Sequence, residues 1–95
     1  MTTAATKKTV QEFLTYRKAH SFYFGQYLDF RFKLRDFVKA AGITQADKRL
    51  IITDPAAASR KGFGSEVIAT ISSYSAIMEH NKLLADDLHN QYHNN

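Results

Sequence analysis

Cysteine is absent from this chain of 95 residues. Without thiols, the protein has no disulfide bonds, no zinc site built from thiolates and no cysteine nucleophile. Long apolar runs are absent as well, because no segment approaches the roughly 20 apolar residues that a membrane-spanning helix needs. The N-terminal stretch MTTAATKKTV has two lysines but no apolar run behind them, so it is not predicted to be a secretory signal. These absences predict a cytoplasmic protein that does not bind a membrane.

Proline and glycine, the residues that interrupt helices, are also scarce, with one Pro and four Gly in the chain. Residues 8–41 contain no proline, and their single glycine is Gly25. Apolar and aromatic residues recur here at steps of three and four: Phe13, Tyr16, His20, Tyr23, Tyr27, Phe30, Leu34, Phe37 and Ala41. This spacing predicts one long helix, straight or bent at Gly25, that ends at Gly42.

The next segment has the start signals of two short helices. Thr44 is a good N-cap, and Asp47 follows at the position from which a carboxylate can bond back to the cap, so a helix is predicted over 45–52. Asp54 followed by Pro55 repeats the signal, and AAASR is expected to form one or two helical turns. The sequence KGFG then predicts a loop in which Phe63 is an aromatic plug.

A second long helix is predicted to begin with Ser65 as its N-cap. Its stripe again steps by fours and threes: Val67, Ile71, Tyr74, Met78, Asn81, Ala85, Leu88 and Tyr92. The predicted fold class is therefore all-α, a long antiparallel helical hairpin with a short helical connector. Residues 1–7 are expected to be a flexible arm, residues 8–92 a single helical domain and residues 93–95 a frayed tail.

The first helix is predicted to be too long and too apolar for a monomer. It would extend about 51 Å, whereas a compact domain of this size is about 32 Å across. Five apolar residues lie off its main stripe: Phe22, Phe24, Leu28, Phe32 and Val38. One antiparallel helix covers one face, so we expect the other faces to pack against further copies in a helical-bundle homo-oligomer.

The expected oligomer interface is the aromatic stripe of the first helix and the polar residue in the stripe of the second: Tyr16, His20, Tyr23, Tyr27, Phe30, Leu34 and Asn81. A single Asn in an apolar stripe often fixes register by pairing with another polar group. Asn81 is accordingly expected to pair with a second Asn81 or with His20. A plain boundary position is the alternative interpretation of Asn81.

Charge is unevenly distributed within the net +4. Residues 1–42 carry eight Lys/Arg against three acids, whereas residues 63–95 carry one lysine against four acids. The segment FYFGQYLDFRFKLRDF, residues 22–37, combines seven aromatic residues with three Lys/Arg. Arginines beside aromatic rings can hold phosphates and stack on bases, which predicts an anion site. Arginines whose stems pack along the rim of a core are the alternative.

The candidate ligand-binding residues come from two places. The first group lies near one line on the first helix, and the second precedes the second long helix, whose N-terminal amides could accept a phosphate. Together they are Arg17, Phe24, Arg31, Arg35, Arg60 and Lys61.

The sequence FVKAAGITQADKRLII resembles a helix-turn-helix motif over about sixteen residues. The resemblance implies DNA contacts by Gln45, Lys48 and Arg49. It departs from the motif at Lys48, where a buried aliphatic residue normally follows the turn. A capped connector whose Leu50, Ile51 and Ile52 close the end of the hairpin is the alternative.

No catalytic constellation appears in the sequence. A Ser-His-Asp order, a glycine-rich phosphate loop and a metal triad are all missing, and His89 and His93 lie in an Asn-rich tail that is a poor frame for a metal. We therefore expect a protein that is not an enzyme and that needs no metal or cofactor. The leading function is capture of a nucleotide or of nucleic-acid phosphates by an oligomer. The alternative is a protein-binding inhibitor or adaptor, such as an accessory protein of a phage or plasmid.

Overall fold

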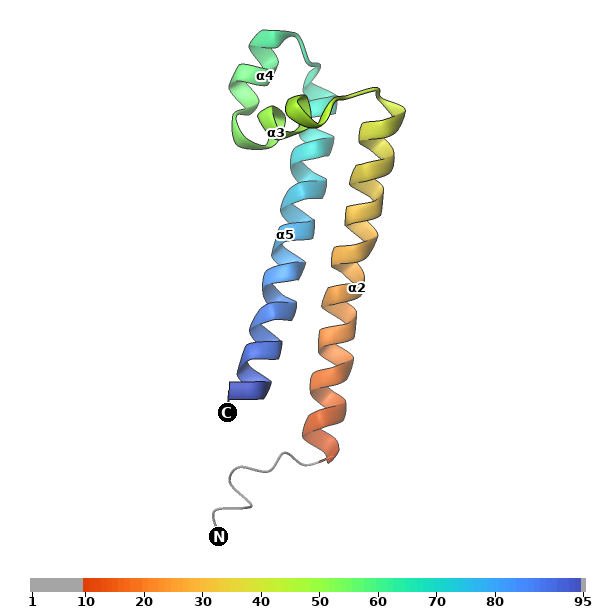
Figure 1. Ribbon diagram of the computed structural model, residues 1–95, viewed down its shortest axis with the longest axis vertical. Coiled ribbons are helices and arrows are strands. Elements are labelled where there is room, and N and C mark those ends of the chain that lie inside the picture. The colour runs from red at the N-terminus through yellow and green to blue at the C-terminus, as the bar shows by residue number, and fades with distance from the viewer. Residues whose placement is uncertain (1–9, 95) are drawn as a thin grey trace.

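The computed structural model describes residues 10–94, and all regular structure in this range is helical. Two long helices, α2 (Val10–Ala40) and α5 (Ser65–Asn94), lie side by side and antiparallel (Figure 1). Two short helices, α3 (Gln45–Thr53) and α4 (Pro55–Lys61), cross one end of the pair. The predicted all-α helical hairpin with a helical connector is confirmed. The predicted arm, residues 1–7, lies outside the described residues.

The molecule is a rod rather than a compact globule. Its extents are 65 × 21 × 17 Å, and its radius of gyration is 18.6 Å, whereas a compact chain of this length would have about 12–13 Å. α2 runs through Gly25 without interruption. α5 likewise continues to Asn94, two residues beyond the predicted end of the domain at residue 92. The expected fraying of the tail stays a prediction.

Gly42 ends α2 and turns the chain into the core. Its φ of 69° is left-handed, a conformation that glycine adopts without steric cost. The Ile43 amide donates to the Val38 carbonyl at 3.0 Å and the Gly42 amide to the Lys39 carbonyl at 3.2 Å. These are the two bonds of a Schellman motif, which brings the residue after the glycine back against the last helical turn. Ile43 accordingly packs against the core that contains Val38.

A second Schellman motif, with Gly62 as its left-handed residue, ends α4. The φ of Gly62 is 115°, and the Phe63 amide donates to the Ala58 carbonyl at 3.1 Å while the Gly62 amide donates to the Ser59 carbonyl. Phe63 is thereby directed against the buried core, which includes Ala58. The aromatic plug predicted between the two glycines is present in the structure.

The predicted N-caps hold for the two short helices but not for α5. Thr44 Oγ1 accepts the Asp47 amide at 3.1 Å, and Asp54 Oδ1 accepts the Ala57 amide at 3.0 Å. Ser65, predicted to be the cap of the second long helix, is instead its first helical residue. The carbonyl one residue earlier, on Gly64, accepts the Ile68 amide.

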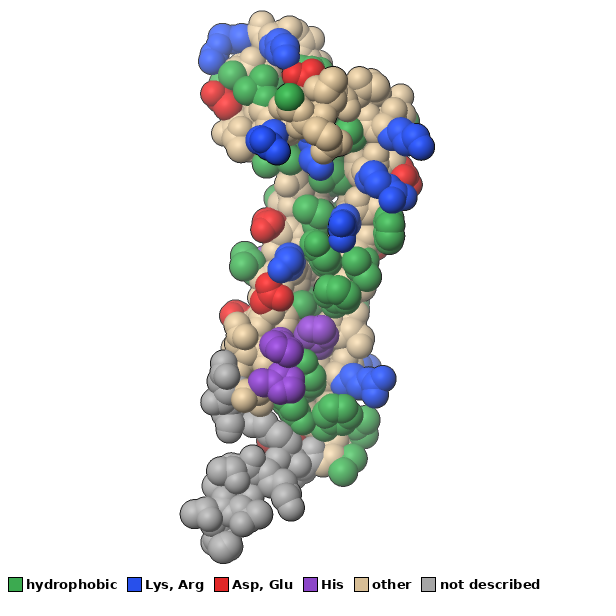
Figure 2. All heavy atoms as spheres, viewed as in Figure 1, with side chains coloured by type: hydrophobic (Ala, Val, Ile, Leu, Met, Phe, Trp, Pro, Cys, Tyr) green, Lys and Arg blue, Asp and Glu red, His purple; other side chains and the backbone are tan. Residues whose placement is uncertain are grey.

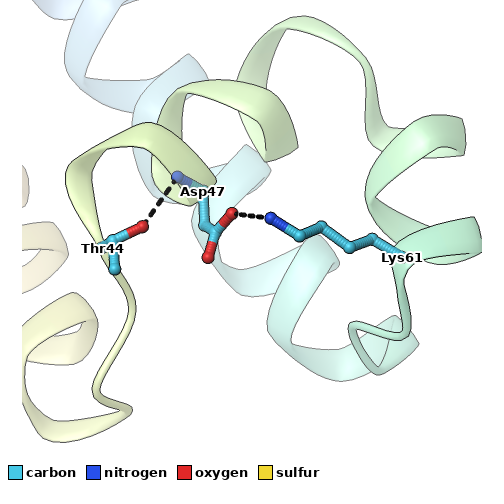
Figure 3. Close-up of polar contacts among 3 residues, drawn as sticks. All are labelled: Thr44, Asp47 and Lys61. Atoms are coloured by element: carbon cyan, nitrogen blue, oxygen red, sulfur yellow. Dashed lines mark hydrogen bonds and ion pairs between the residues drawn. The ribbon is translucent and has the colours of Figure 1, made fainter.

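Asp47 was predicted to bond back to its cap, and a hydrogen bond with the Thr44 side chain is among the causes that lower the pKa of its carboxyl. The Asp47 carboxylate also reaches α4: Lys61 Nζ lies 2.6 Å from Asp47 Oδ1, and Thr44 Oγ1 accepts the Asp47 amide (Figure 3). The ion pair joins residues 14 positions apart. It therefore ties α3 to α4 within the connector.

Replacing Lys61 by Met is expected to change the titration of Asp47. The hydrogen bond from Lys61 lowers the pKa of the Asp47 carboxyl below its ordinary 3.8. A lowered folded-state pKa contributes stability that is present above the unfolded-state pKa and is lost as the pH falls through the folded-state value. Lys61→Met should therefore raise the Asp47 pKa toward 3.8, as measured by NMR titration. Arg60→Met, which removes a neighbouring cation without a bond to Asp47, is the matched control, and an unchanged Asp47 pKa in Lys61→Met would contradict the pair.

The buried core lies at the connector end of the rod. Its members come from all four helices: Leu34, Val38, Ile51, Ala58 and Ile71. Partly buried apolar side chains surround it: Phe37, Ile43, Leu50, Phe63, Val67, Ile68, Tyr74 and Met78. Within residues 10–94, Ala85 is the one other buried hydrophobic residue. The core is confined to this end because two helices alone bury few side chains, such as Ala85 and Asn81, whereas the connector adds further walls.

The open end of the hairpin is held mainly by stacked rings. The Tyr16 and Tyr92 rings stack with centroids 4.2 Å apart, and Phe13 lies 6.2 Å from Tyr92. The Tyr16 hydroxyl is 3.4 Å from His89 Nδ1, within hydrogen-bonding distance. His20 lies 6.3 Å from the same imidazole. Aromatic contacts thus hold α2 and α5 together at the open end, whereas a buried aliphatic core holds the helices together at the connector end.

Candidate functional site

A cationic hollow of about 590 Å³ lies where α2, the start of α3 and α5 meet. We call it the Arg31 hollow. It is lined by residues from these three helices: Tyr27, Arg31, Phe32, Leu34, Arg35, Val38, Gln45, Lys48 and Met78. Most of them lie on α2 at steps of three and four, which places them on one side of that helix.

The floor and the rim of the Arg31 hollow differ in polarity. Leu34 and Val38 belong to the buried core, so the bottom of the hollow is apolar. Arg31 and Arg35 rise from exposed positions of α2, and the half-buried Lys48 approaches from α3. The Schellman turn at Gly42 brings α3 over the last turns of α2, and this turn makes the third cation part of the site.

Little within the described part of the chain neutralises these cations. Arg35 Nε is 3.7 Å from Asp36 Oδ1, but both side chains are about 70% exposed, and such a surface pair is weak. The Arg35 guanidinium lies 5.0 Å from the centre of the Phe32 ring, a cation–π distance. Among residues 10–94, neither Arg31 nor Lys48 has an ion-pair partner.

The structure separates the residues predicted to bind a ligand. Arg31 and Arg35 line the hollow, whereas Arg17 lies about 21 Å from Arg31 along the same helix. Phe24 lies between them and stacks on His20 with centroids 5.9 Å apart. Arg17 and Phe24 are therefore on the same side of α2 as the hollow but do not line it.

Arg60 and Lys61 lie on α4, away from the hollow. Lys61 is already bonded to Asp47 in the connector. Neither residue is among those that line the hollow.

Gln45 and Lys48 were not assigned to the anion site, although sequence analysis singled them out as DNA contacts of the helix-turn-helix resemblance. One sequence signal could have assigned them to the anion site. Lys48 stands where the helix-turn-helix pattern expects a buried aliphatic residue, and a lysine at a buried position can mark a binding site. In the structure, Lys48 is half-buried because it faces the hollow, while Arg49 beside it is exposed.

The residues predicted to form the oligomer interface lie mostly in the seam between α2 and α5 of the same chain. Leu34 is in the core, Tyr16 stacks on Tyr92, and the Phe30 ring meets Tyr74 edge-on at 5.8 Å. The other members of the set lie in or beside the same seam. His20 lies beside His89, Tyr27 lines the hollow, and Tyr23 is half-buried.

Asn81 is buried, and its partner is local. Its Nδ2 donates to the Ile77 carbonyl of the preceding turn at 2.8 Å. The expected pairing with His20 is not formed within the chain, because His20 packs against Phe24 and His89. Pairing with a second Asn81 stays a prediction.

Histidine side chains gather on a face of the hairpin that also carries Lys and Arg side chains (Figure 2). His89 lies 4.4 Å from His93 and 6.3 Å from His20 by ring centroids. Within the described residues, no group of three His, Cys, Asp or Glu is arranged to hold a metal ion. The rings therefore take part in the aromatic packing of the open end.

Comparison of the chain with protein-family models, with curated proteins and with solved structures finds no match in any of the three. Across residues 10–94, none of the helices combines the length and the apolar character that a membrane span requires. The functional argument accordingly rests on the geometry of the site.

Proposed function

We propose that this chain is a non-enzymatic, oligomeric binding protein that captures an anionic ligand, a nucleotide or the phosphates of a nucleic acid, in the Arg31 hollow. The observation that carries the proposal is the convergence of three cations from two helices, Arg31, Arg35 and Lys48, at one concave site. The absence of ion-pair partners for Arg31 and Lys48 among the described residues leaves their charges available to a ligand.

The other features of the hollow favour a nucleotide among small anions. Its volume of about 590 Å³ is within the range of small-molecule sites. A guanidinium can hold a phosphate through two parallel hydrogen bonds, and the Tyr27 and Phe32 rings offer faces on which a base can stack. Phosphates are expected at the rim with Arg31 and Lys48, and the base is expected nearer the aromatic rings.

The side chains that line the Arg31 hollow are suited to binding a ligand rather than to converting it chemically. The polar groups that line the hollow are cations, one amide and one phenol, and none of the lining residues is a carboxylate or a histidine. A site that held a phosphoryl group for hydrolysis would need a group to orient or deprotonate the attacking water. We therefore expect the ligand to be released unchanged.

Replacing Arg31 and Arg35 together by Gln is expected to weaken nucleotide binding by about tenfold for each arginine, because each loses a charge-assisted hydrogen bond. Both side chains are exposed, so helicity and subunit mass should be unaffected. Calorimetric titration with a nucleoside triphosphate at low salt measures the loss. Arg49→Gln, which removes an exposed arginine from α3 outside the hollow, is the matched control. Equal affinity of the double variant and the control would contradict the proposal.

Arg17 separates the two ligand classes within the proposal. A nucleic-acid strand that follows the cations of α2 would reach Arg17, so Arg17→Gln should weaken binding of a single-stranded oligonucleotide and reduce its steep dependence on salt. A nucleotide held in the hollow alone should be insensitive to Arg17→Gln and less sensitive to salt. The salt slopes of wild type and variant are the measurement.

A protein-binding inhibitor or adaptor is the second candidate. It is favoured by large apolar side chains that are exposed in the single chain, among them Leu14, Phe22 and Leu83. Such side chains can anchor a partner. Failure of the wild-type chain to bind either nucleotide or oligonucleotide at low salt would favour this candidate over anion capture.

A further inference from the structure

The arginines of α2 all lie on the side of the helix that carries the Arg31 hollow. At 3.6 residues per turn, Arg17 and Arg35 are each displaced by about 40° from Arg31 around the helix axis. The acids of α2 lie about 100–160° from Arg31, on other sides of the helix: Glu12, Asp29 and Asp36. One long side of α2 is therefore cationic and free of carboxylates.

Aromatic rings stand between these arginines on the same side. Phe24 lies about 20° from Arg31 around the axis, and its side chain is 43% exposed. The Phe24 ring stacks on His20 with centroids 5.9 Å apart and lies 5.7 Å from the Tyr27 ring. Because Tyr27 also lines the Arg31 hollow, this row of rings leads from the open end of the hairpin into the hollow. Figure 2 shows a face on which Lys and Arg side chains recur along the rod, with hydrophobic and His side chains between them.

The wall that α5 adds beside these rings is nearly neutral. Lys82 Nζ bonds to Asp86 Oδ2 at 3.0 Å, and the pKa of Lys82 is raised by this bond first and also by the nearby Tyr27 and Glu79. One lysine and two acids sum to a single negative charge. The three arginines of α2 and Lys48 of the hollow supply four positive charges on the same side, so the excess charge there is positive.

The cations are spread over a distance that one nucleotide does not span. Arg17 lies about 21 Å from Arg31 along α2. Stacked nucleotides of one strand are spaced by about 3.4 Å, so this distance corresponds to about six nucleotides. Among residues 10–94, Arg17 has no ion-pair partner, as is the case for Arg31 and Lys48. All three charges are therefore available to one extended anion.

The exposed rings favour a single strand over other extended anions. Aromatic side chains stack on the faces of unpaired bases, and basic groups beside them hold the backbone. In a duplex, the base faces are covered by the neighbouring base pairs. An acidic peptide would pair with the arginines but has no base to place on Phe24.

We propose that a single strand of DNA or RNA binds along this side of the hairpin, from the Arg31 hollow to Arg17. Its phosphates contact Arg17, Arg31 and Lys48, and its bases stack on Phe24 and Tyr27. We call these five residues the strand-binding surface. The inference rests on the proposed function, because the hollow forms one end of this surface, and it names the class of ligand.

Replacing Phe24 by Ala is expected to weaken binding of an oligothymidylate of about twelve nucleotides by about fivefold or more, since one stacked base is lost. Phe22→Ala is the matched control. Phe22 is 59% exposed but lies on the opposite side of α2, about 180° from Arg31. Fluorescence anisotropy at low salt measures both affinities. Equal affinities of the two variants would overturn the strand-binding surface.

Replacing Arg17 by Gln tests the far end of the surface without changing a ring. The affinity for the same oligothymidylate is expected to fall by about tenfold, because one charge-assisted hydrogen bond is lost. Lys18→Gln is the matched control, because Lys18 is the next residue and is also exposed, but points about 140° away from Arg31. Circular dichroism should show the same helicity in both variants. A loss in Lys18→Gln as large as that in Arg17→Gln would contradict a one-sided surface.

Strand length and strand type test the ligand class. The affinity should rise with length until the strand reaches Arg17, after about six to eight nucleotides, and then level off. A duplex of the same length and an oligoglutamate of the same charge should bind more weakly, and equal binding of either would overturn the proposal. Oligouridylate is titrated in parallel with oligothymidylate, and tighter binding of one supports the surface and identifies whether it takes RNA or DNA.

Failure of this inference is distinguishable from failure of anion capture in the hollow. A nucleoside triphosphate that binds as tightly as the oligothymidylate, with neither affected by Phe24→Ala or Arg17→Gln, would overturn the strand-binding surface and leave the Arg31 hollow intact as a site. Binding of neither ligand would overturn both. Strand binding that is weakened by Phe24→Ala, by Arg17→Gln and by joint replacement of Arg31 and Arg35 would support both.

Discussion

Replacing Ile71 by Ala is expected to lower the free energy of unfolding by about 2–5 kcal/mol. Ile71 is fully buried at the centre of the core, among side chains from α2, α3 and α4. Truncation removes apolar contacts and leaves a cavity that the surrounding helices cannot close without moving. A domain of this size has a total stability of about 5–14 kcal/mol, so the loss would leave a large unfolded fraction if the total is near the lower value.

Urea denaturation followed by circular dichroism measures this loss. Leu83→Ala is the matched control, because Leu83 lies on the same helix and is 62% exposed. Its replacement is expected to change the stability by no more than about 0.5 kcal/mol. Similar losses in the two variants would show that the stability does not reside at the connector end.

Gly62→Ala is expected to destabilise the protein by about 1–3 kcal/mol, the cost of holding a residue with a Cβ in a strained backbone region. Gly62 has a φ of 115°, well beyond the left-handed region that alanine tolerates best. No atom lies within 4 Å of the position that a Cβ would occupy, so the cost is conformational rather than a clash. The variant should also loosen Phe63, whose place in the core depends on the turn.

Gly25→Ala is the matched comparison and should have the opposite sign. Gly25 is in the middle of α2, exposed and with open space around its Cβ position. Alanine there is expected to stabilise the helix by about 0.5–1 kcal/mol, because it restricts the unfolded chain more than the folded one. Thermal denaturation of the two variants measures both effects. A stabilising Gly62→Ala would contradict the left-handed turn.

Local rules were sufficient to predict most of the secondary structure. Gly42 as a helix end and Asp54 as a helix start each depend on bonds to residues a few positions away, which a sequence displays directly. The prediction that Ser65 is a cap was wrong by one residue, since the Gly64 carbonyl makes the first helical bond instead. Serine is also acceptable inside a first helical turn, so the two positions are hard to separate by residue type.

The composition of the candidate site depends on contacts that no local rule provides. Arg31 and Arg35 were selected because they share a helix face with aromatic residues. Lys48 reaches them only because the turn after α2 folds α3 back over that helix, and this direction is set by Ile43 packing into the core. Arg17 and Lys61 were included in the predicted anion site because they are basic, with Arg17 on the first long helix and Lys61 shortly before the second. The lengths and directions of the helices exclude both from the hollow.

The confinement of the core to one end has a consequence for how the chain opens. Amide hydrogens of α2 near Val38 are expected to exchange with solvent only when the whole domain unfolds, whereas those near residues 12–20 should exchange through local separation of the helices. The core also joins segments that are close along the chain, such as Val38 and Ile51, so closing it costs little loop entropy. Folding is therefore expected to start at the connector, and the pairing of α2 with α5 is expected to proceed from there toward the two termini.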